Sequence, residues 1–193
     1  RGAGTRAAKP HNFRLDLAAD RALQGVTEFD LNTRTVHSQV AGNALFSQAG
    51  LPNAYGAPVQ VRVNSANLAN AQPTGTTDSF QFGSYYCFEP YSSDWAAAHL
   101  PADPGGNIYK GLWYQDYVKL TNGAVFDWRG TNTDNYRMEY GPSGPTSNTG
   151  AYSKQNNKAE DDWSDLINLC TILSLTPSSN YAAAVSQIVD IDE

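Results

Sequence analysis

Cationic side chains beside glycines open the sequence. A Gly2-Ala3-Gly4 turn lies between Arg1 and Arg6, and Lys9 follows three residues later. Glycine lets backbone N–H groups point at phosphate oxygens, and arginine binds such oxygens through a fork of donors. This segment could therefore cradle an anion. A solvated basic turn between two strands would have the same composition.

Two further cations and one carboxylate lie on predicted strands or at their ends. Arg62 stands on the polar side of an alternating strand, Lys110 ends a short strand, and Glu89 ends an aromatic one. A strand-borne cation can contact nucleotide phosphates, as the lysine of ordinary kinases does. An exposed side chain or a cross-strand ion pair is the other interpretation. Glu89 could pair with a lysine, bind a metal, or lie on the surface.

Acidic residues gather at two places in the last third of the chain. They are Asp161, Asp162 and Asp165, followed by Asp190, Asp192 and Glu193. The first three are at i, i+1 and i+4, so they do not share one helix face, and acidic residues are favoured at helix N-termini by the helix dipole alone. We therefore predict helix starts here. With three His and two Cys in the chain, we assign no metal ligands and no catalytic residue.

These residues must be positioned by strands in the first part of the chain and helices in the last. Alternating or aromatic runs predict strands at 12–17, 26–31, 58–64, 79–89, 107–112 and about 124–128. Helical spacing predicts a helix at 37–49 that Gly50 ends, and a short one from Ser92 or Ser93 to His99. A third helix has Asn157 as its cap, Glu160, Asp161 and Asp162 in its first turn, and an apolar stripe of Trp163, Leu166, Ile167, Cys170 and Leu173. A fourth runs over about 180–189.

This order of elements predicts an α+β fold with a mostly antiparallel sheet and a few packed helices. Residues 1–193 have the length of a single domain or of part of one. We expect a loop insertion at 65–78 and a loop at 141–150, where Gly, Pro, Asn, Ser and Thr show no periodicity. Both ends look cut, so we expect a piece of a longer protein.

Composition excludes some partners. The net charge is −6, and the 13 Lys and Arg form no run, so nucleic acid and anionic membranes are not expected partners. No apolar run of membrane-spanning length occurs, so we expect no membrane insertion. Charged residues make up 17% of the chain, against about 25% in typical domains. A polar but weakly charged surface is common in secreted and cell-surface proteins, which is where we expect this one.

Cysteine and tryptophan each leave two interpretations open. Cys87 and Cys170 lie among apolar residues, which favours two buried thiols, although one disulfide would suit a secreted protein. The tryptophans could belong to the core or form a glycan-binding face, and they are Trp95, Trp113, Trp128 and Trp163.

A set of short, spaced motifs resembles the N-terminal portion of the CotH kinase family, the spore-coat-protein-H-like atypical protein kinases. The matching positions, which span nearly the whole chain, are Arg1, Gly2, Arg6, Lys9, Phe13, Leu31, Asn32, Gly50, Asn64, Gly83, Tyr85, Glu89, Gly106, Asn107, Tyr109, Lys110 and Gly111. Asp161-Asp162-Trp163 and Val189-Asp190-Ile191-Asp192 also resemble landmarks of the family.

The resemblance implies an atypical kinase-like fold that transfers phosphate from ATP to protein Ser or Thr with a divalent metal, Mg or Mn. It implies nucleotide contacts from Arg1, Arg6, Lys9, Arg62, Glu89 and Lys110. In the family the metal-binding aspartates follow the Val-Asp-x-Asp landmark, so we expect residues 1–193 alone to be inactive. The alternative is a non-catalytic surface module of the same fold that binds a glycan or an assembly partner.

Overall fold

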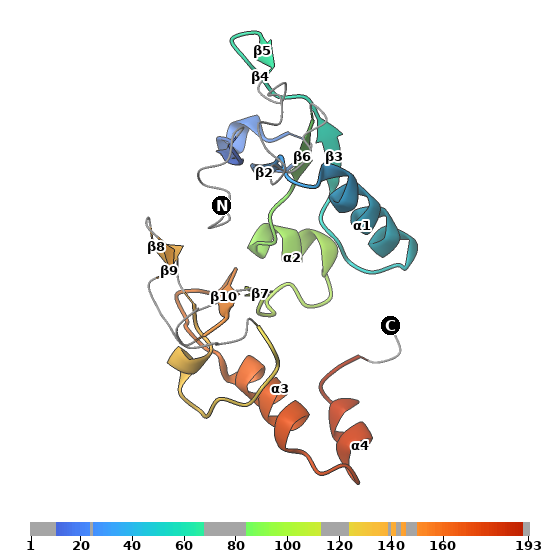
Figure 1. Ribbon diagram of the computed structural model, residues 1–193, viewed down its shortest axis with the longest axis vertical. Coiled ribbons are helices and arrows are strands. Elements are labelled where there is room, and N and C mark those ends of the chain that lie inside the picture. Colours follow the sequence, from blue (N-terminus) through green and yellow to red (C-terminus); the bar gives the residue numbers. More distant parts are fainter. Residues whose placement is uncertain are drawn as a thin grey trace, which may run out of the picture. The chain divides into compact units, whose positions relative to one another are not determined.

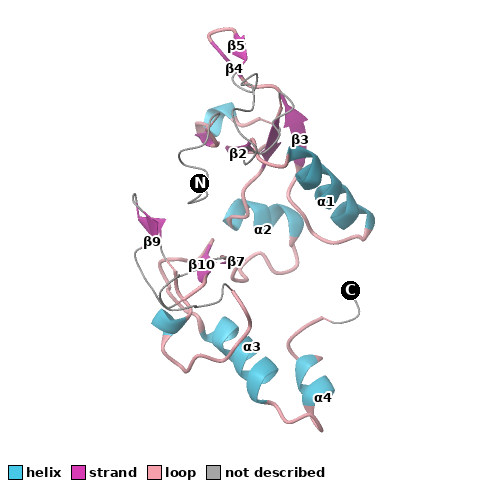
Figure 2. Cartoon of the chain, viewed as in Figure 1, coloured by secondary structure: helices cyan, strands magenta, loops and turns pink. Residues whose placement is uncertain are grey.

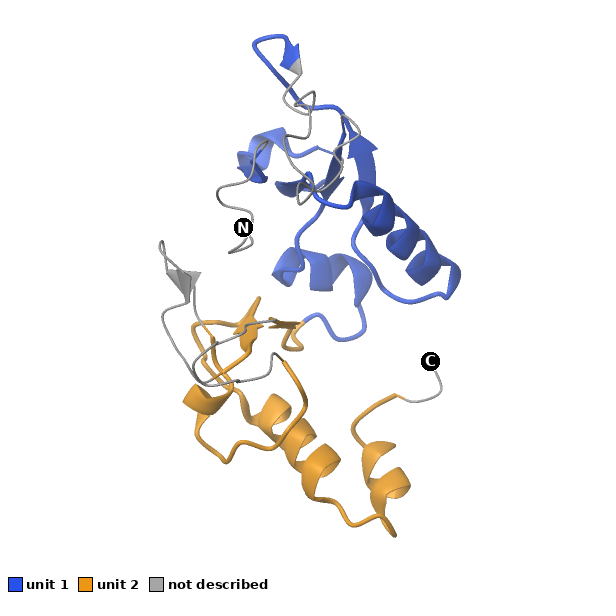
Figure 3. Ribbon diagram, viewed as in Figure 1, with its two compact units in different colours: residues 1–104 blue, residues 105–193 orange. Residues whose placement is uncertain are grey.

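Short strands make up most of the elements along the chain in the computed structural model, and its last two elements are the helices α3 and α4 (Figures 1 and 2). The structure describes residues 11–23, 25–67, 84–112, 124–138, 140–141, 144–145 and 150–190. The chain divides into two compact units, residues 1–104 and 105–193 (Figure 3). The antiparallel α+β class predicted from the sequence is confirmed.

The first unit is built on a four-stranded antiparallel sheet in the order β1-β2-β6-β3. Its strands are β1 (Phe13–Asp16), β2 (Glu28–Asn32), β3 (Gly56–Val59) and β6 (Tyr85–Phe88). The register places Leu31 opposite Cys87 and Val59 opposite Tyr85. Leu31 and Tyr85 are buried at the centre of this unit's apolar cluster.

Strand β1 lies at the edge of this sheet and is exposed along its whole length. The strand predicted at 12–17 is confirmed, but alternation of polar and apolar residues is typical of a half-buried strand, whereas β1 is exposed. An edge strand has a neighbouring strand on one side only. Here a pair of side chains joins β1 to that neighbour, β2, in addition to the backbone pairing. Arg14 donates from Nε and Nη2 to the two carboxylate oxygens of Asp30, at 2.8 and 2.9 Å.

Two helices accompany the first sheet. Helix α1 (Val36–Gln48) is close to the predicted helix, and Gly50 follows it with a φ of 76°, which glycine adopts without strain. Helix α2 (Ser93–His99) begins as predicted, because the Ser92 hydroxyl oxygen accepts a hydrogen bond from the Trp95 N–H at 3.4 Å.

The strand predicted at 58–64 is divided. Strand β3 ends at Val59, and β4 (Arg62–Val63) pairs with β5 (Ala66–Asn67). Asn64 and Ser65 both have positive φ values, 49° and 67°. A two-residue turn of this kind favours a tight hairpin, so local pairing wins over a longer strand. Part of the predicted 65–78 insertion is thus strand β5, and residues 68–83 lie outside the described part of the chain.

The described residues of the second unit form two short ladders and two α-helices. Strand β7 (Tyr109–Gly111) pairs with β10 (Tyr152–Lys154), and β8 (Tyr140–Gly141) pairs with β9 (Gly144–Pro145). The helices are α3 (Ser164–Leu175) and α4 (Tyr181–Val185). Short 3-10 turns occur in both units, η2 (Ala19–Arg21) in the first and η3 (Thr133–Asn135) in the second.

Two local predictions in the second unit are wrong. Residues 124–128 form no strand; instead the Trp128 N–H donates to the Ser174 hydroxyl at 2.8 Å, so α3 satisfies that backbone group in place of a neighbouring strand. The predicted 141–150 loop contains strand β9, and residues 142–143 and 146–149 of it lie outside the described residues.

Helix α3 begins later than predicted. Asn157 and Asp161 have left-handed φ values of 48° and 49°, which a helix cannot contain. The chain therefore turns through 158–160, and the helix starts at Ser164. The predicted cap at Asn157 and the placement of Glu160, Asp161 and Asp162 in the first turn are therefore wrong, and the acidic residue of that turn is Asp165.

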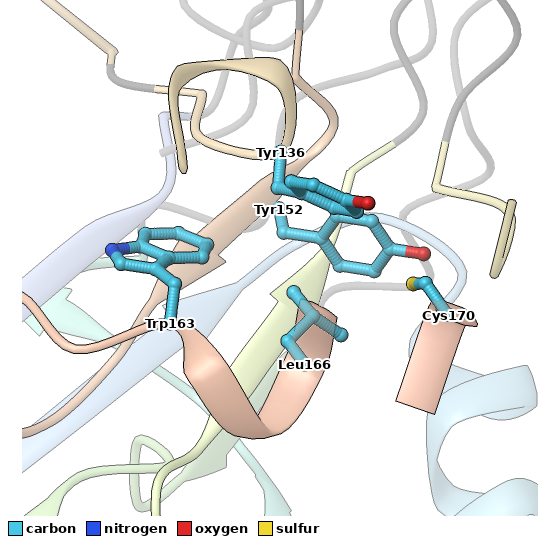
Figure 4. Close-up of a cluster of buried hydrophobic side chains, with 5 residues drawn as sticks. All are labelled: Tyr136, Tyr152, Trp163, Leu166 and Cys170. Carbon is cyan, nitrogen blue, oxygen red and sulfur yellow. The ribbon is translucent and has the colours of Figure 1, made fainter. Parts of the chain in front are cut away.

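An aromatic cluster forms the core of the second unit. Its buried members are Tyr136, Tyr152, Trp163, Leu166 and Cys170. Figure 4 shows Leu166 and Cys170 on α3 facing the two tyrosine rings. The predicted stripe is confirmed for its members Trp163, Leu166 and Cys170, which are buried.

Both cysteines are free thiols. Cys170 is buried and Cys87 is partly buried, and burial raises the pKa of each thiol. This agrees with the interpretation of two apolar thiols and not with a disulfide. Among the described helices, none is long and apolar enough to cross a membrane.

Replacing Gly150 with Ala should destabilise the second unit. A Cβ there would collide with the backbone of Tyr136 and Arg137, and overpacking of this kind costs about 3 kcal/mol. Gly42→Ala in α1 is the matched control, because nothing lies near the added Cβ, and it should stabilise by about 1 kcal/mol. Urea unfolding of both variants checks this. Equal stability of the two variants would contradict it.

Candidate functional site

The predicted phosphate-contacting residues are spread over both units. Arg1, Arg6 and Lys9 lie outside the described residues. Arg62 is exposed on β4, and Glu89 is buried directly after β6; both belong to the first unit. Lys110 is exposed on β7 in the second unit.

The structure does not bring Arg62 and Glu89 together. Glu89 follows Phe88, which lies opposite Gly56 at the start of β3. Arg62 comes after the other end of β3, where Val59 lies opposite Tyr85. The two side chains therefore stand at opposite ends of the β3–β6 ladder. Their predicted contacts with a nucleotide stay predictions.

Glu89 is held in a buried, hydrogen-bonded pair. Its Oε1 lies 2.5 Å from His99 Nε2 and accepts the Tyr55 backbone N–H at 2.8 Å. The two side chains are only 7% and 9% exposed. The His99 ring lies 5.1 Å from the Trp95 ring and 4.6 Å from the Tyr55 ring, measured between centroids. Glu89 is thus not a surface carboxylate, and its partner is a histidine from α2.

Lys110 lies on β7, and the Asn156 side chain holds the backbone that leads into this strand. Lys110 is directly opposite Ser153. The buried Asn156 side chain accepts the Ile108 N–H at 2.7 Å and donates to the Gly106 carbonyl at 2.8 Å. These two bonds satisfy backbone groups before β7, and the Gln155 N–H donates to the Ile108 carbonyl at 2.8 Å. The sequence analysis missed Asn156.

Next to this ladder is a pocket of about 370 Å³ that the sequence analysis also missed. Its lining combines three cations, a carboxylate, a hydroxyl and two apolar side chains, namely Arg137, Lys154, Lys158, Asp161, Ser153, Met138 and Trp163. The only sequence signal was a lysine in the short Tyr152-Ser153-Lys154 run. Such a run is too short to show which side faces inward.

Two of the cations in this pocket are held in place by neighbours. Lys154 is 5% exposed, and its Nζ donates to the Asp162 carbonyl at 2.5 Å. The Arg137 guanidinium donates from Nη2 to Asp161 Oδ2 at 2.6 Å and lies 5.7 Å above the Trp163 ring. Both head groups are therefore fixed before any ligand arrives.

The three acidic residues near α3 serve different partners. Asp161 accepts from the Trp163 indole N–H at 2.9 Å, and this bond, with help from Arg137, lowers the pKa of Asp161. Asp162 accepts the Ser164 N–H at 2.9 Å, which lowers the pKa of Asp162. Asp165 accepts the Tyr109 hydroxyl at 2.5 Å. Within the described ranges no group of three His, Cys, Asp or Glu could hold a metal ion.

The tryptophans are mostly core residues. Trp95 and Trp163 are buried, Trp128 is 44% exposed, and Trp113 lies outside the described residues. Within the described part of the chain, Trp128 is therefore the one tryptophan that could stack on a sugar.

Comparison with known proteins gives a family for the chain. The sequence model described as CotH kinase protein matches residues 1–193, the whole chain. No curated protein sequence is significantly similar to it.

Replacing Glu89 with Gln should destabilise the first unit by about 2 kcal/mol, because hydrogen bonds to a buried charged group contribute this much. Glu28→Gln removes the same charge at a side chain that is 43% exposed, and it should change stability by less than about 0.5 kcal/mol. Chemical denaturation measures the free energy of unfolding of both variants. A loss no larger for Glu89 than for Glu28 would show that the buried pair contributes little.

Protonation of the Asp161 carboxylate should make the stability of the protein depend on pH in the acid range. Its pKa is lowered in the folded state, so its contribution is present above the unfolded pKa of about 3.9 and is lost as the pH falls through the lower folded value. The difference in Tm between the wild type and Asp161→Asn should be largest near neutral pH and should close below about pH 4. Thermal unfolding across this range checks the sign, and a pH-independent difference would refute it.

Proposed function

The chain belongs to the CotH kinase family, and on this premise we propose that it is the N-terminal part of an atypical protein kinase. The reaction transfers the γ-phosphoryl group of ATP to a Ser or Thr hydroxyl of a protein. The match of the family model to the whole chain carries the proposal. The motifs quoted from the sequence support it independently.

The exposed cations are the residues that suit this chemistry best. Phosphoryl transfer is catalysed by positioning and by neutralising phosphate charge. Arg62 and Lys110 are exposed on short strands, where their head groups can reach a ligand. We assign phosphate contacts to them and to Arg1, Arg6 and Lys9 on the family pattern. Glu89 fits a positioning role better than a ligand contact, because its Oε1 already accepts two hydrogen bonds.

The divalent metal is not accommodated by the described residues. No suitable group of three ligating side chains occurs among them, and the family pattern places the metal-binding aspartates after Asp192. We therefore propose that residues 1–193 bind ATP but do not transfer phosphate without the segment that carries those aspartates. Mg or Mn would supply charge neutralisation there.

We also propose an extracellular or cell-surface location for the protein. The support is compositional, since charged residues make up only 17% of the chain and polar uncharged residues fill the balance.

A non-catalytic surface module that binds a glycan or a protein partner is the second candidate. Large exposed aromatic side chains favour it, since such rings stack on sugars. In the first unit Tyr55 is 70% exposed and Tyr91 is 44% exposed, and in the second unit Trp128 is 44% exposed.

ATP binding separates the two candidates. Calorimetric titration of residues 1–193 with ATP and Mg should show binding, and Lys110→Gln should weaken it about tenfold, the effect of losing one charge-assisted hydrogen bond. Arg21→Gln, which removes an exposed cation on η2 outside the assigned set, should leave binding unchanged. No heat with ATP, together with binding to oligosaccharide, would replace the kinase proposal with the surface module. Phosphate transfer by residues 1–193 alone would contradict the proposed inactivity.

A further inference from the structure

We propose that the pocket formed by Arg137, Lys154 and Lys158 in the second unit binds a small phosphate-bearing anion. The observation that carries this is a 370 Å³ pocket lined by three cations and one carboxylate, in which the buried Lys154 ammonium forms no ion pair within 4.0 Å with any described residue. The inference rests on the charge and shape of this unit and not on the kinase proposal. None of these three residues belongs to the set assigned to ATP.

Lys154 gives the strongest argument. Lys154 is only 5% exposed, and its Nζ donates to a neutral acceptor, the Asp162 carbonyl. The Asp161 and Asp162 carboxylates act on it electrostatically without forming an ion pair. Among the described residues, no carboxylate lies within 4.0 Å of its Nζ. An ammonium has three N–H donors, and burying a charge is costly unless an opposite charge pairs with it. A bound anion would supply that charge.

Arg137 provides the second contact in a fixed orientation. Its guanidinium lies over the Trp163 ring and donates to Asp161, which together restrict its rotation. A guanidinium held in this way loses little entropy when it binds a planar or tetrahedral oxyanion. Lys158, exposed on the turn that follows β10, brings a third cation to the same pocket.

Charge and size together define the ligand. The lining has three cations against one carboxylate, Asp161, so it favours an anion. A volume of 370 Å³ is near the lower end of about 300–1,000 Å³ for ligand pockets. Met138 and Trp163 are 2% and 3% exposed, so they offer almost no surface on which a base could stack. The Ser153 hydroxyl adds a donor suited to a phosphate oxygen.

Titration of residues 1–193 with inorganic pyrophosphate, without metal, tests the site. We expect saturable binding, and calorimetry measures it. Lys154→Met should weaken it about tenfold, and Lys158→Gln about threefold, as expected for a buried and an exposed cation. Asp161→Asn removes the one carboxylate of the lining and should tighten binding. Arg21→Gln is the control with an equal loss of charge elsewhere and should have no effect.

If Lys154→Met does not fold, the variants at Lys158 and Asp161 still test the proposal. Lys158 and Asp161 are exposed, and opposite changes in affinity from these two cannot come from a general loss of structure. Absence of binding at millimolar pyrophosphate, or an equal weakening by Arg21→Gln, would overturn the site. Competition by ATP would identify a nucleotide as the source of the phosphate, and absence of competition a free phosphate; either result keeps the proposal. If the ATP titration contradicted the kinase proposal, we would still expect residues 1–193 to bind pyrophosphate.

Discussion

The burial of Trp163 is the interaction on which the second unit depends. The ring belongs to the apolar cluster with Leu166, its indole N–H donates to Asp161, and the Arg137 guanidinium lies over its face. One side chain thus joins the core, the turn before α3 and the wall of the cationic pocket. Because α3 begins directly after it, the packing of this ring helps to set the helix start, and the Asp162 carboxylate accepts the first backbone N–H of the helix.

The first unit depends instead on a central strand. Strand β6 pairs with both β2 and β3, so it joins segments that are far apart in the chain. At its end, Glu89 connects this sheet to α2 through His99. A carboxylate that the sequence suggested for ligand contact therefore acts within the fold.

The chain belongs to the CotH kinase family, and under our proposal its short cationic motifs contact phosphate. The family positions predict where phosphate contacts would come from, and the structure places Arg62 and Lys110 where solvent can reach them. The pocket around Lys154 adds a concentration of positive charge that the family motifs did not include. A weakly charged, acidic chain thus places a cluster of cations around one small pocket.

The sequence by itself determined the class of the fold, the family and the position of most elements. Alternation predicted β1, an aromatic run predicted β6, the Ser92 cap predicted the start of α2, and Gly50 predicted the end of α1, because each depends on local composition or on one residue's backbone preference. Tertiary structure decided what local pattern cannot: the exposure of β1, the division of the 58–64 run by its Asn64-Ser65 turn, and the late start of α3. It also decided the pairing of Glu89 with His99 and the placing of Arg137 and Lys154 in the wall of one pocket. Side chains from different elements come together only when those elements pack, and their spacing along the chain does not show it.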